Sequence, residues 1–98
     1  MGSFSSIINS GELVLIDFHA LWCGPCKVLA PVLKDVKHDL GDQIKIIKID
    51  VDKNQLLAAK YQVRGVPTMI LFKNGKPLWR QSGVLQKSEI INVVKQYF

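Results

Sequence analysis

The hydrophobic period of this chain switches between strand-like and helix-like patterns along its length, and this alternation limits the folds that it can adopt. Residues 13–19 form a nearly continuous apolar run broken by Asp17, which is typical of a strand buried on both faces of a parallel sheet. Four apolar residues then recur at helical spacing before Gly41: Leu29, Leu33, Val36 and Leu40. Since strands joined through a helix must cross over, we expect the strands that are separated by helices to be parallel, and only the last hairpin to add an antiparallel edge.

The same alternation continues to the C-terminus. We expect a short helix around residues 4–8, strands over 43–51, 68–73 and 77–82, and helices over 54–61 and 90–98. The pair Asn74-Gly75 between the last two strands is the strongest short signal for a β-hairpin. The order αβαβαββα therefore predicts an α/β fold with a central mixed sheet of about four strands and helices on both faces.

Length and composition indicate one domain over residues 1–98, because 98 residues with 48% hydrophobic content can bury one core but not two. The longest apolar runs, 13–16 and 69–72, are far shorter than the ~20 residues of a membrane-spanning helix. The net charge of +5 arises from scattered lysines and arginines, without the dense basic block of a nucleic-acid site. We expect a soluble monomer with no nucleic-acid or membrane partner, and the absence of a secretory signal pattern favours the cytoplasm.

Both cysteines of the chain lie three residues apart, at the point where a strand pattern changes to a helix pattern. Residues at this spacing on a helix have Cβ atoms about 5 to 6 Å apart, whereas a disulfide needs about 3.5 to 4.5 Å. Cys23 is therefore expected just outside the regular helical turn, as the exposed end of the pair. Free N–H groups of the helix would face its sulfur and favour the thiolate. The spacing favours redox chemistry.

A zinc site is the alternative use of two thiols. Structural zinc usually takes four protein ligands, and only His19 and His38 could join the two cysteines. Because His38 lies well along the predicted helix, away from the thiols, we expect no metal.

The motifs of the chain together resemble the thioredoxin family. They are Asp17-Phe18, the six residues Trp22-Cys23-Gly24-Pro25-Cys26-Lys27, Gly65-Val66-Pro67-Thr68, Phe72-Lys73-Asn74-Gly75 and Gly83. The resemblance spans nearly the whole chain and implies a single thioredoxin domain. It differs at His19, where the family usually has a large aromatic residue, and at the start, where the extra N-terminal edge strand common in the family is missing.

The resemblance implies a protein-disulfide reductase with no cofactor other than its own redox-active disulfide. Cys23 would be the nucleophile and Cys26 the resolving thiol, while Gly24 and Pro25 would set the reduction potential. The implied partners are an NADPH-dependent thioredoxin reductase and disulfide-containing proteins. Two alternatives stay open, namely a disulfide oxidase or isomerase, and a binding subunit in which the thiols are incidental.

Asp17 interrupts an apolar strand, where an isolated carboxylate is costly unless it is neutral or paired. Burial should raise the pKa of Asp17, and such a group could accept and return the proton of Cys26. The alternative is a structural pair with Lys48, which would oppose the upward shift. The two are compatible, because a lysine can tune a base. His19 follows on the same strand face, either as a packed side chain or as a pH modulator of the thiols.

The segment around Pro67 is expected to form the substrate-binding surface. By resemblance the Val66-Pro67 bond is cis and lies beside Cys23, which would leave the Val66 backbone free to pair with an extended substrate. Trp22, Gly65 and Gly83 would complete a flat apolar surface. The alternative for Trp22 is a role as core filler.

Residues 50–54 begin like a calcium-binding loop, but the glycine and glutamate that such a loop needs are replaced by Gln55 and Tyr61. Capping of the following helix is the better interpretation.

Overall fold

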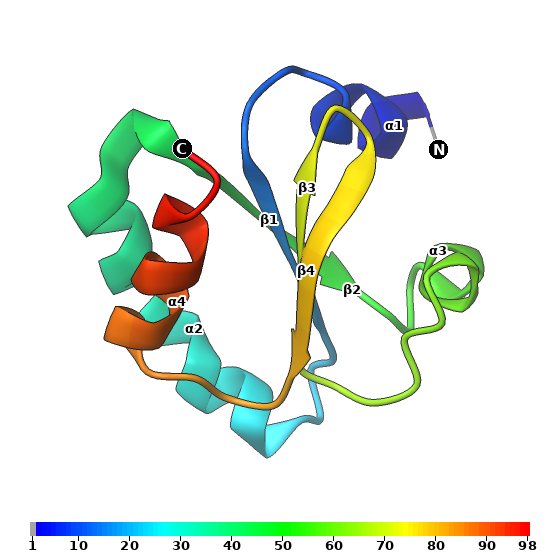
Figure 1. The fold of residues 1–98 in the computed structure, drawn as a ribbon. Helices are drawn as coiled ribbons and strands as arrows, with labels where there is room; N and C mark the ends of the chain where they lie inside the picture. The colour runs from blue at the N-terminus through cyan, green and yellow to red at the C-terminus, as the bar shows by residue number, and fades with distance from the viewer. Residues whose placement is uncertain (1) are drawn as a thin grey trace.

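A computed structural model describes residues 2–98 of the chain, so that residue 1 of the expected 1–98 domain lies outside the description. Figure 1 shows the elements in the order α1 (Gly2–Ile8), β1 (Val14–His19), α2 (Gly24–Leu40), η1 (Gly41–Gln43), β2 (Lys45–Asp50), α3 (Gln55–Lys60), β3 (Thr68–Lys73), β4 (Lys76–Ser82) and α4 (Lys87–Lys95). The predicted order of helices and strands is confirmed. The short 3-10 turn η1 was not expected.

The sheet contains four strands in the order β2-β1-β3-β4. The β1 and β2 strands are parallel, whereas β3 is antiparallel to both β1 and β4. Helices α2 and α4 cover one face, and α1 and α3 cover the other (Figure 1). The predicted mixed sheet with two covered faces is confirmed, and within residues 2–98 no strand lies outside β2. The expectation that strands separated by helices are parallel is wrong for β3: the chain after α3 re-enters the sheet at Thr68, beside Phe18, which is the same end of β1 where β2 finishes, so β3 runs in the opposite direction.

The alternation of side chains along β1 decides which core each residue joins. Val14, Ile16 and Phe18 pack in the core beneath α1 and α3. Leu15 points to the opposite face, into the core made with α2 and α4. Asp17 therefore lies on the α2 side of the sheet, facing the helix that carries both cysteines.

The hairpin between β3 and β4 forms at the two predicted turn residues. Asn74 has φ 51° and Gly75 has φ 79°. Positive φ at both central residues is the requirement of a type I′ turn, whose twist matches that of the strands. This turn places β4 at the edge of the sheet opposite β2.

Candidate active site

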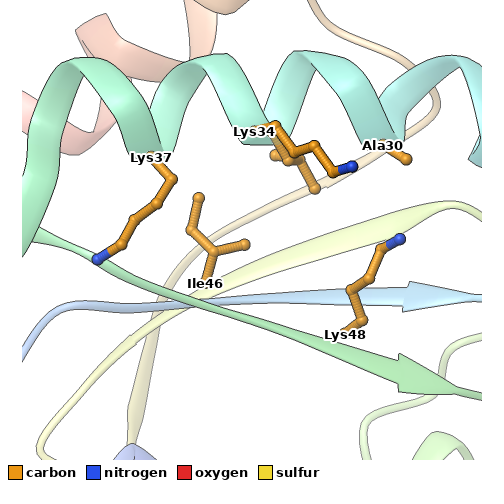
Figure 2. Close-up of a pocket in the computed structure, with 6 residues that line it drawn as sticks. Ala30, Lys34, Lys37, Ile46 and Lys48 are labelled. Carbon is orange, nitrogen blue, oxygen red and sulfur yellow. The ribbon is translucent and has the colours of Figure 1, made fainter.

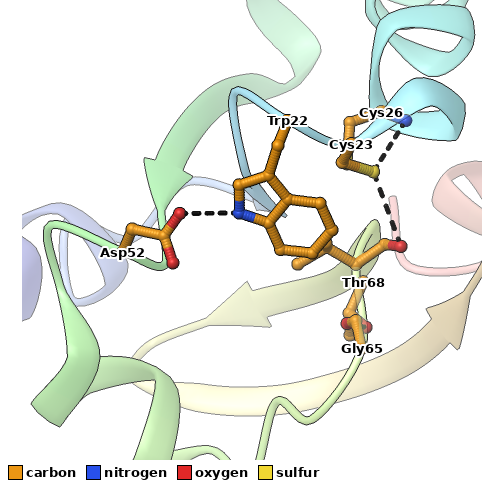
Figure 3. Close-up of a disulfide and its surroundings, with 7 residues drawn as sticks. Trp22, Cys23, Cys26, Asp52, Gly65 and Thr68 are labelled. Atoms are coloured by element: carbon orange, nitrogen blue, oxygen red, sulfur yellow. Dashed lines mark hydrogen bonds between the residues drawn. A yellow bond between two sulfur atoms is a disulfide. The ribbon is translucent and has the colours of Figure 1, made fainter.

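The two cysteines lie at the N-terminal end of α2, directly after β1, and form a disulfide with a Cα–Cα distance of 5.3 Å (Figure 3). Cys23 is the N-cap residue of α2, with the extended backbone angles φ −87° and ψ 112°. Cys26 belongs to the first turn, which also holds Pro25 where no N–H is needed. The predicted position of Cys23 just outside the regular turn is confirmed.

The sulfur of Cys23 is placed to be stabilised as a thiolate. The backbone N–H of Cys26 donates to the Cys23 Sγ at 3.1 Å. This N–H is one of the groups that the helix itself leaves unpaired, and the helix dipole adds positive potential at the same end. Both effects favour negative charge on Cys23 once the disulfide is reduced.

The prediction that Cys23 is the exposed end of the pair is wrong for the disulfide form. Cys23 is 3% exposed and Cys26 is 5% exposed. The cause is packing that local spacing does not reveal, because Ala20 and the half-buried Val51 and Val66 surround the sulfur pair. The two cysteines therefore differ in their position on the helix and not in their solvent exposure.

Pro67 lies beside the cysteines, and the peptide bond between Val66 and Pro67 is cis. The carbonyl oxygen of Val66 is 3.6 Å from the Cys23 Sγ. The Pro67 carbonyl accepts the N–H of Gly83 at 2.9 Å, where the chain adopts φ 89°. The structure thus brings the predicted residues 65–67 and 83 together next to Cys23.

Thr68 holds this loop in place. Its hydroxyl donates to the Gly65 carbonyl at 2.7 Å and is 3.0 Å from the Ser82 hydroxyl. The first contact ties the loop at Gly65 to the start of β3, and the second connects the start of β3 to the end of β4. Thr68 is a supporting residue for the predicted surface.

Trp22 stands at the surface, and its interpretation as core filler is wrong. The side chain is 71% exposed. Its Nε1 donates to the Asp52 Oδ2 at 2.8 Å, which fixes the ring beside the disulfide (Figure 3). Asp52 was missed by the sequence analysis, since no local pattern connects residues thirty positions apart.

The interpretation of residues 50–54 as a helix cap is also wrong. Asn54, the N-cap residue of α3, makes no side-chain capping bond. Instead the Asp50 Oδ1 accepts the N–H groups of Asp52 at 2.8 Å and Lys53 at 3.4 Å. These residues form a turn that carries Asp52 to Trp22.

Asp17 is buried without a hydrogen-bond partner. It is 0% exposed, and among residues 2–98 neither carboxyl oxygen has a partner. Desolvation raises the pKa of Asp17 above its usual value, while the charges of His19 and Lys48 act in the opposite direction. Burial dominates because both charges act without direct contact.

The alternative structural pair between Asp17 and Lys48 is not formed. Lys48 is the register neighbour of Asp17 across the parallel strands β1 and β2. Lys48 is nevertheless absent from the ion pairs within the described part of the chain. Lys48 can therefore tune Asp17 at a distance, but it does not neutralise it.

The two histidines considered as possible zinc ligands lie apart from each other. His19 is half-buried at the end of β1. The His38 side chain is 89% exposed on α2 and is 3.5 Å from the Asp39 carboxylate. Within residues 2–98 no three His, Cys, Asp or Glu side chains gather in a way that could hold a metal ion.

A dithiol at the tip of a helix, beside a cis-proline loop on a mixed sheet, defines a thiol-disulfide oxidoreductase. Comparison with known proteins agrees with this class. A family model for thioredoxin matches residues 1–96. Thioredoxin from Haemophilus influenzae is 42% identical over 93 residues, covering 95% of this chain and 87% of the relative. The chain belongs to the thioredoxin family, and it is a protein-disulfide reductase that acts by dithiol/disulfide exchange.

Other similar proteins differ in length. The rice protein named thioredoxin Y, chloroplastic (Oryza sativa subsp. japonica) is 43% identical over 94 residues. The match covers 95% of this chain but only 56% of that relative. The bifunctional thioredoxin reductase/thioredoxin of Mycobacterium leprae is 42% identical over 88 residues, which cover 90% of this chain and 19% of that protein. Among solved structures, a mutant thioredoxin from Halobacterium salinarum has a TM-score of 0.90 at 35% identity, covering 99% of this chain and 84% of that one.

Proposed function

We propose that Cys23 and Cys26 divide the exchange reaction between them. The Cys23 thiolate attacks one sulfur of a substrate disulfide, forms a mixed disulfide and releases the other substrate sulfur as a thiolate. Cys26 then loses its proton and attacks the Cys23 sulfur, which releases the second substrate thiol and closes the Cys23–Cys26 disulfide. Two electrons pass to the substrate, and its two thiolates take up protons. The observation that supports this order is the N-cap position of Cys23, whose sulfur accepts the Cys26 N–H.

Trapping tests this division of roles. A Cys26→Ser variant should accumulate covalent adducts with disulfide substrates through Cys23, because the second attack is removed. The matched Cys23→Ser variant should accumulate none. A binding subunit with incidental thiols would instead hold its partners after treatment with a reductant, in both variants. A strongly oxidising potential, measured against glutathione, would favour the oxidase or isomerase alternative.

Asp17 is proposed as the group that takes the proton of Cys26 during the second attack and returns it in the reverse direction. The support is its burial on the α2 side of the sheet, and the raised pKa allows it to exchange protons nearer neutral pH. An Asp17→Asn variant should slow release of the mixed disulfide more than its formation. Equal slowing of both steps in stopped-flow kinetics would remove this role. Lys48 acts on Asp17 through its charge.

Substrates are proposed to dock on the surface around Cys23. An extended substrate would pair with the backbone of Val66 next to the cis-Pro67, flanked by Trp22, Gly65 and Gly83. Backbone pairing places few demands on side chains, which suits a reductase with many protein substrates. The exposed Trp22 ring, held by Asp52, offers apolar contact area.

Gly24, Pro25 and His19 are proposed to adjust the thiols. Gly24 and Pro25 occupy the turn between the two cysteines and set the reduction potential. His19 lies one residue beyond Phe18 at the end of β1, on the same face as Asp17, and modulates the pH response. If so, His19→Trp should shift the pH profile of Cys23 alkylation. An unchanged profile would show that His19 only packs.

The proposed electron donor is a thioredoxin reductase that uses NADPH. The Mycobacterium leprae relative, which carries both names in one chain, supports this pairing. We further propose that the protein is a monomer. We also propose that it works in the cytoplasm, which its similarity to a bacterial thioredoxin supports, while the rice relative is named as chloroplastic. Among the described residues, no helix has the length and apolar character needed to cross a bilayer. Purified reductase, NADPH and insulin as substrate would test the pairing.

A further inference from the structure

The strand β2 lies at one edge of the sheet, and part of its backbone faces away from its neighbour. The N–H of Lys45 donates to the Leu13 carbonyl at 2.9 Å, on the β1 side. Because successive residues of a strand point their backbone groups to opposite sides, the N–H and C=O groups of Ile46 and Lys48 point outward. Such groups are a template for pairing with another strand.

Side chains close both ends of this edge and leave its middle open. Lys37 donates to the carbonyls of Gly41 at 2.8 Å and Ile44 at 2.7 Å. At the other end, Asn54 donates to the Asp50 carbonyl at 2.9 Å. The outward groups in the middle of β2 have no partner among residues 2–98, so the free edge is short and well defined.

A pocket of about 210 Å³ lies beside this edge, between α2 and β2. Figure 2 shows Lys37 at one end of the pocket, with Lys34 and Lys48 extending their ammonium groups toward the other end. The residues that line it are three apolar side chains and three lysines: Ala30, Leu33, Ile46, Lys34, Lys37 and Lys48. Among the described residues, none of these lysines forms an ion pair. The pocket therefore combines an apolar floor with uncompensated positive charge.

We propose that the free edge of β2 and the adjoining lysine pocket form a docking site for an extended segment of a partner protein that alternates acidic and apolar side chains. The segment would add a strand to the sheet, with main-chain bonds to Ile46 and Lys48. Its alternate side chains would then face the two sides of the sheet. On the α2 side carboxylates would meet Lys34 and Lys48, and on the other side apolar side chains would cover the half-buried Ile47 and Ile49.

The charge of the pocket argues against a second copy of this chain as the occupant. Pairing two β2 edges antiparallel would bring a second set of the same three lysines to the interface, and like charges placed together disfavour association. A free carboxylate ion would satisfy the lysines but would leave the outward backbone groups of β2 unpaired. An acidic strand satisfies both. The site shares Lys48 with the charge that acts on Asp17, but its lining does not include Cys23, and docking requires no redox step.

The test uses a fluorescein-labelled, acetylated hexapeptide that alternates valine and glutamate, added to the oxidised full chain. Fluorescence anisotropy should show saturable binding that weakens with added salt. In ¹H–¹⁵N spectra, the amides of Ile46 and Lys48 should shift. Lys34→Glu should weaken binding about fivefold, since an attractive charge pair becomes a repulsive one. Lys76→Glu, the same charge change on the opposite edge strand β4, should leave binding unchanged.

Two control peptides separate charge from strand pairing. A peptide that alternates valine and lysine should not bind, nor should the glutamate peptide when it is N-methylated on the residues that face β2. The proposal is overturned if either control binds as well as the test peptide, or if the test peptide fails to bind. The proposal is also overturned if the amide shifts caused by the peptide centre on Trp22, because the peptide would then bind at the dithiol. It is overturned as well if acetate alone produces the same amide shifts, or if these shifts appear when the chain is concentrated without peptide.

Discussion

Replacing Asp17 by asparagine should stabilise the protein by an amount that grows with pH. Asp17 is 0% exposed, and neither of its oxygens has a partner among residues 2–98. Asparagine has nearly the same size and polarity but cannot ionise, so it reproduces the protonated form of the native side chain. The variant and the native protein should therefore be equally stable where Asp17 is protonated. At a pH where Asp17 is ionised in the folded protein, the variant should be the more stable of the two, because folding then buries a charge in the native protein only.

The sign and size of the effect follow from the direction of the pKa shift. Burial raises the pKa of Asp17 in the folded protein, whereas the unfolded chain has the ordinary value of about 3.9. Between the two values the folded state keeps a proton that the unfolded state has released. The free energy of unfolding of the native protein then falls by about 1.4 kcal/mol for each pH unit. Below the unfolded pKa the penalty is absent, and above the folded pKa it is constant.

Guanidinium unfolding of the oxidised protein, followed by tryptophan fluorescence from about pH 3.5 to about pH 9, measures this difference. The oxidised form is used because its cysteines do not titrate. Asp42→Asn, a substitution at an exposed carboxyl, is the matched control and should show no comparable rise. A stability difference for Asp17→Asn that does not change with pH, or a less stable variant at alkaline pH, would refute the reasoning.

Three further substitutions test the packing, the backbone and the surface of the site. Leu29→Ala removes a fully buried side chain of α2 and should cost about 2 to 5 kcal/mol in urea unfolding, and a loss below 1 kcal/mol would contradict this. Gly83→Ala places a side chain on a backbone with φ 89° and should lower the free energy of unfolding by about 1 to 2 kcal/mol. Gly24 has open space around it and no positive φ, so Gly24→Ala should lower it by less in the same assay. Trp22→Phe removes the hydrogen bond to Asp52, which joins two exposed groups, and should change the free energy of unfolding by less than about 1 kcal/mol. A loss above about 2 kcal/mol in thermal unfolding would show instead that this bond supports the fold.

Much of the fold could be read from short-range pattern because each element carries its own signal. Strand β3 was predicted with the bounds that the structure shows, since turn residues border a continuous apolar run. The hairpin at Asn74 and Gly75 was equally clear, because few residue pairs tolerate positive φ at both positions. The bounds of β2 were predicted less accurately: the expected strand covers residues 43–51, whereas the structure has Lys45–Asp50. The edge position of β2 weakens the hydrophobic signal at its ends.

The candidate site was predicted in its residue types but not in its surroundings. The N-cap position of Cys23 followed from the geometry of a disulfide across three residues. The burial of Cys23 did not, because Val51 and Val66 approach it from other parts of the chain. The bond from Trp22 to Asp52 escaped prediction for the same reason.

Local spacing was thus enough to specify a dithiol at a helix tip, because the distance between the two cysteines and the start of a helix depend on neighbouring residues alone. Which groups surround that dithiol is a consequence of packing between distant elements. The desolvation of Asp17 requires α2 to cover β1, and the unpaired edge of β2 depends on the order of strands in the sheet. Burial and long-range contacts set these properties, and they exist only once the chain has folded.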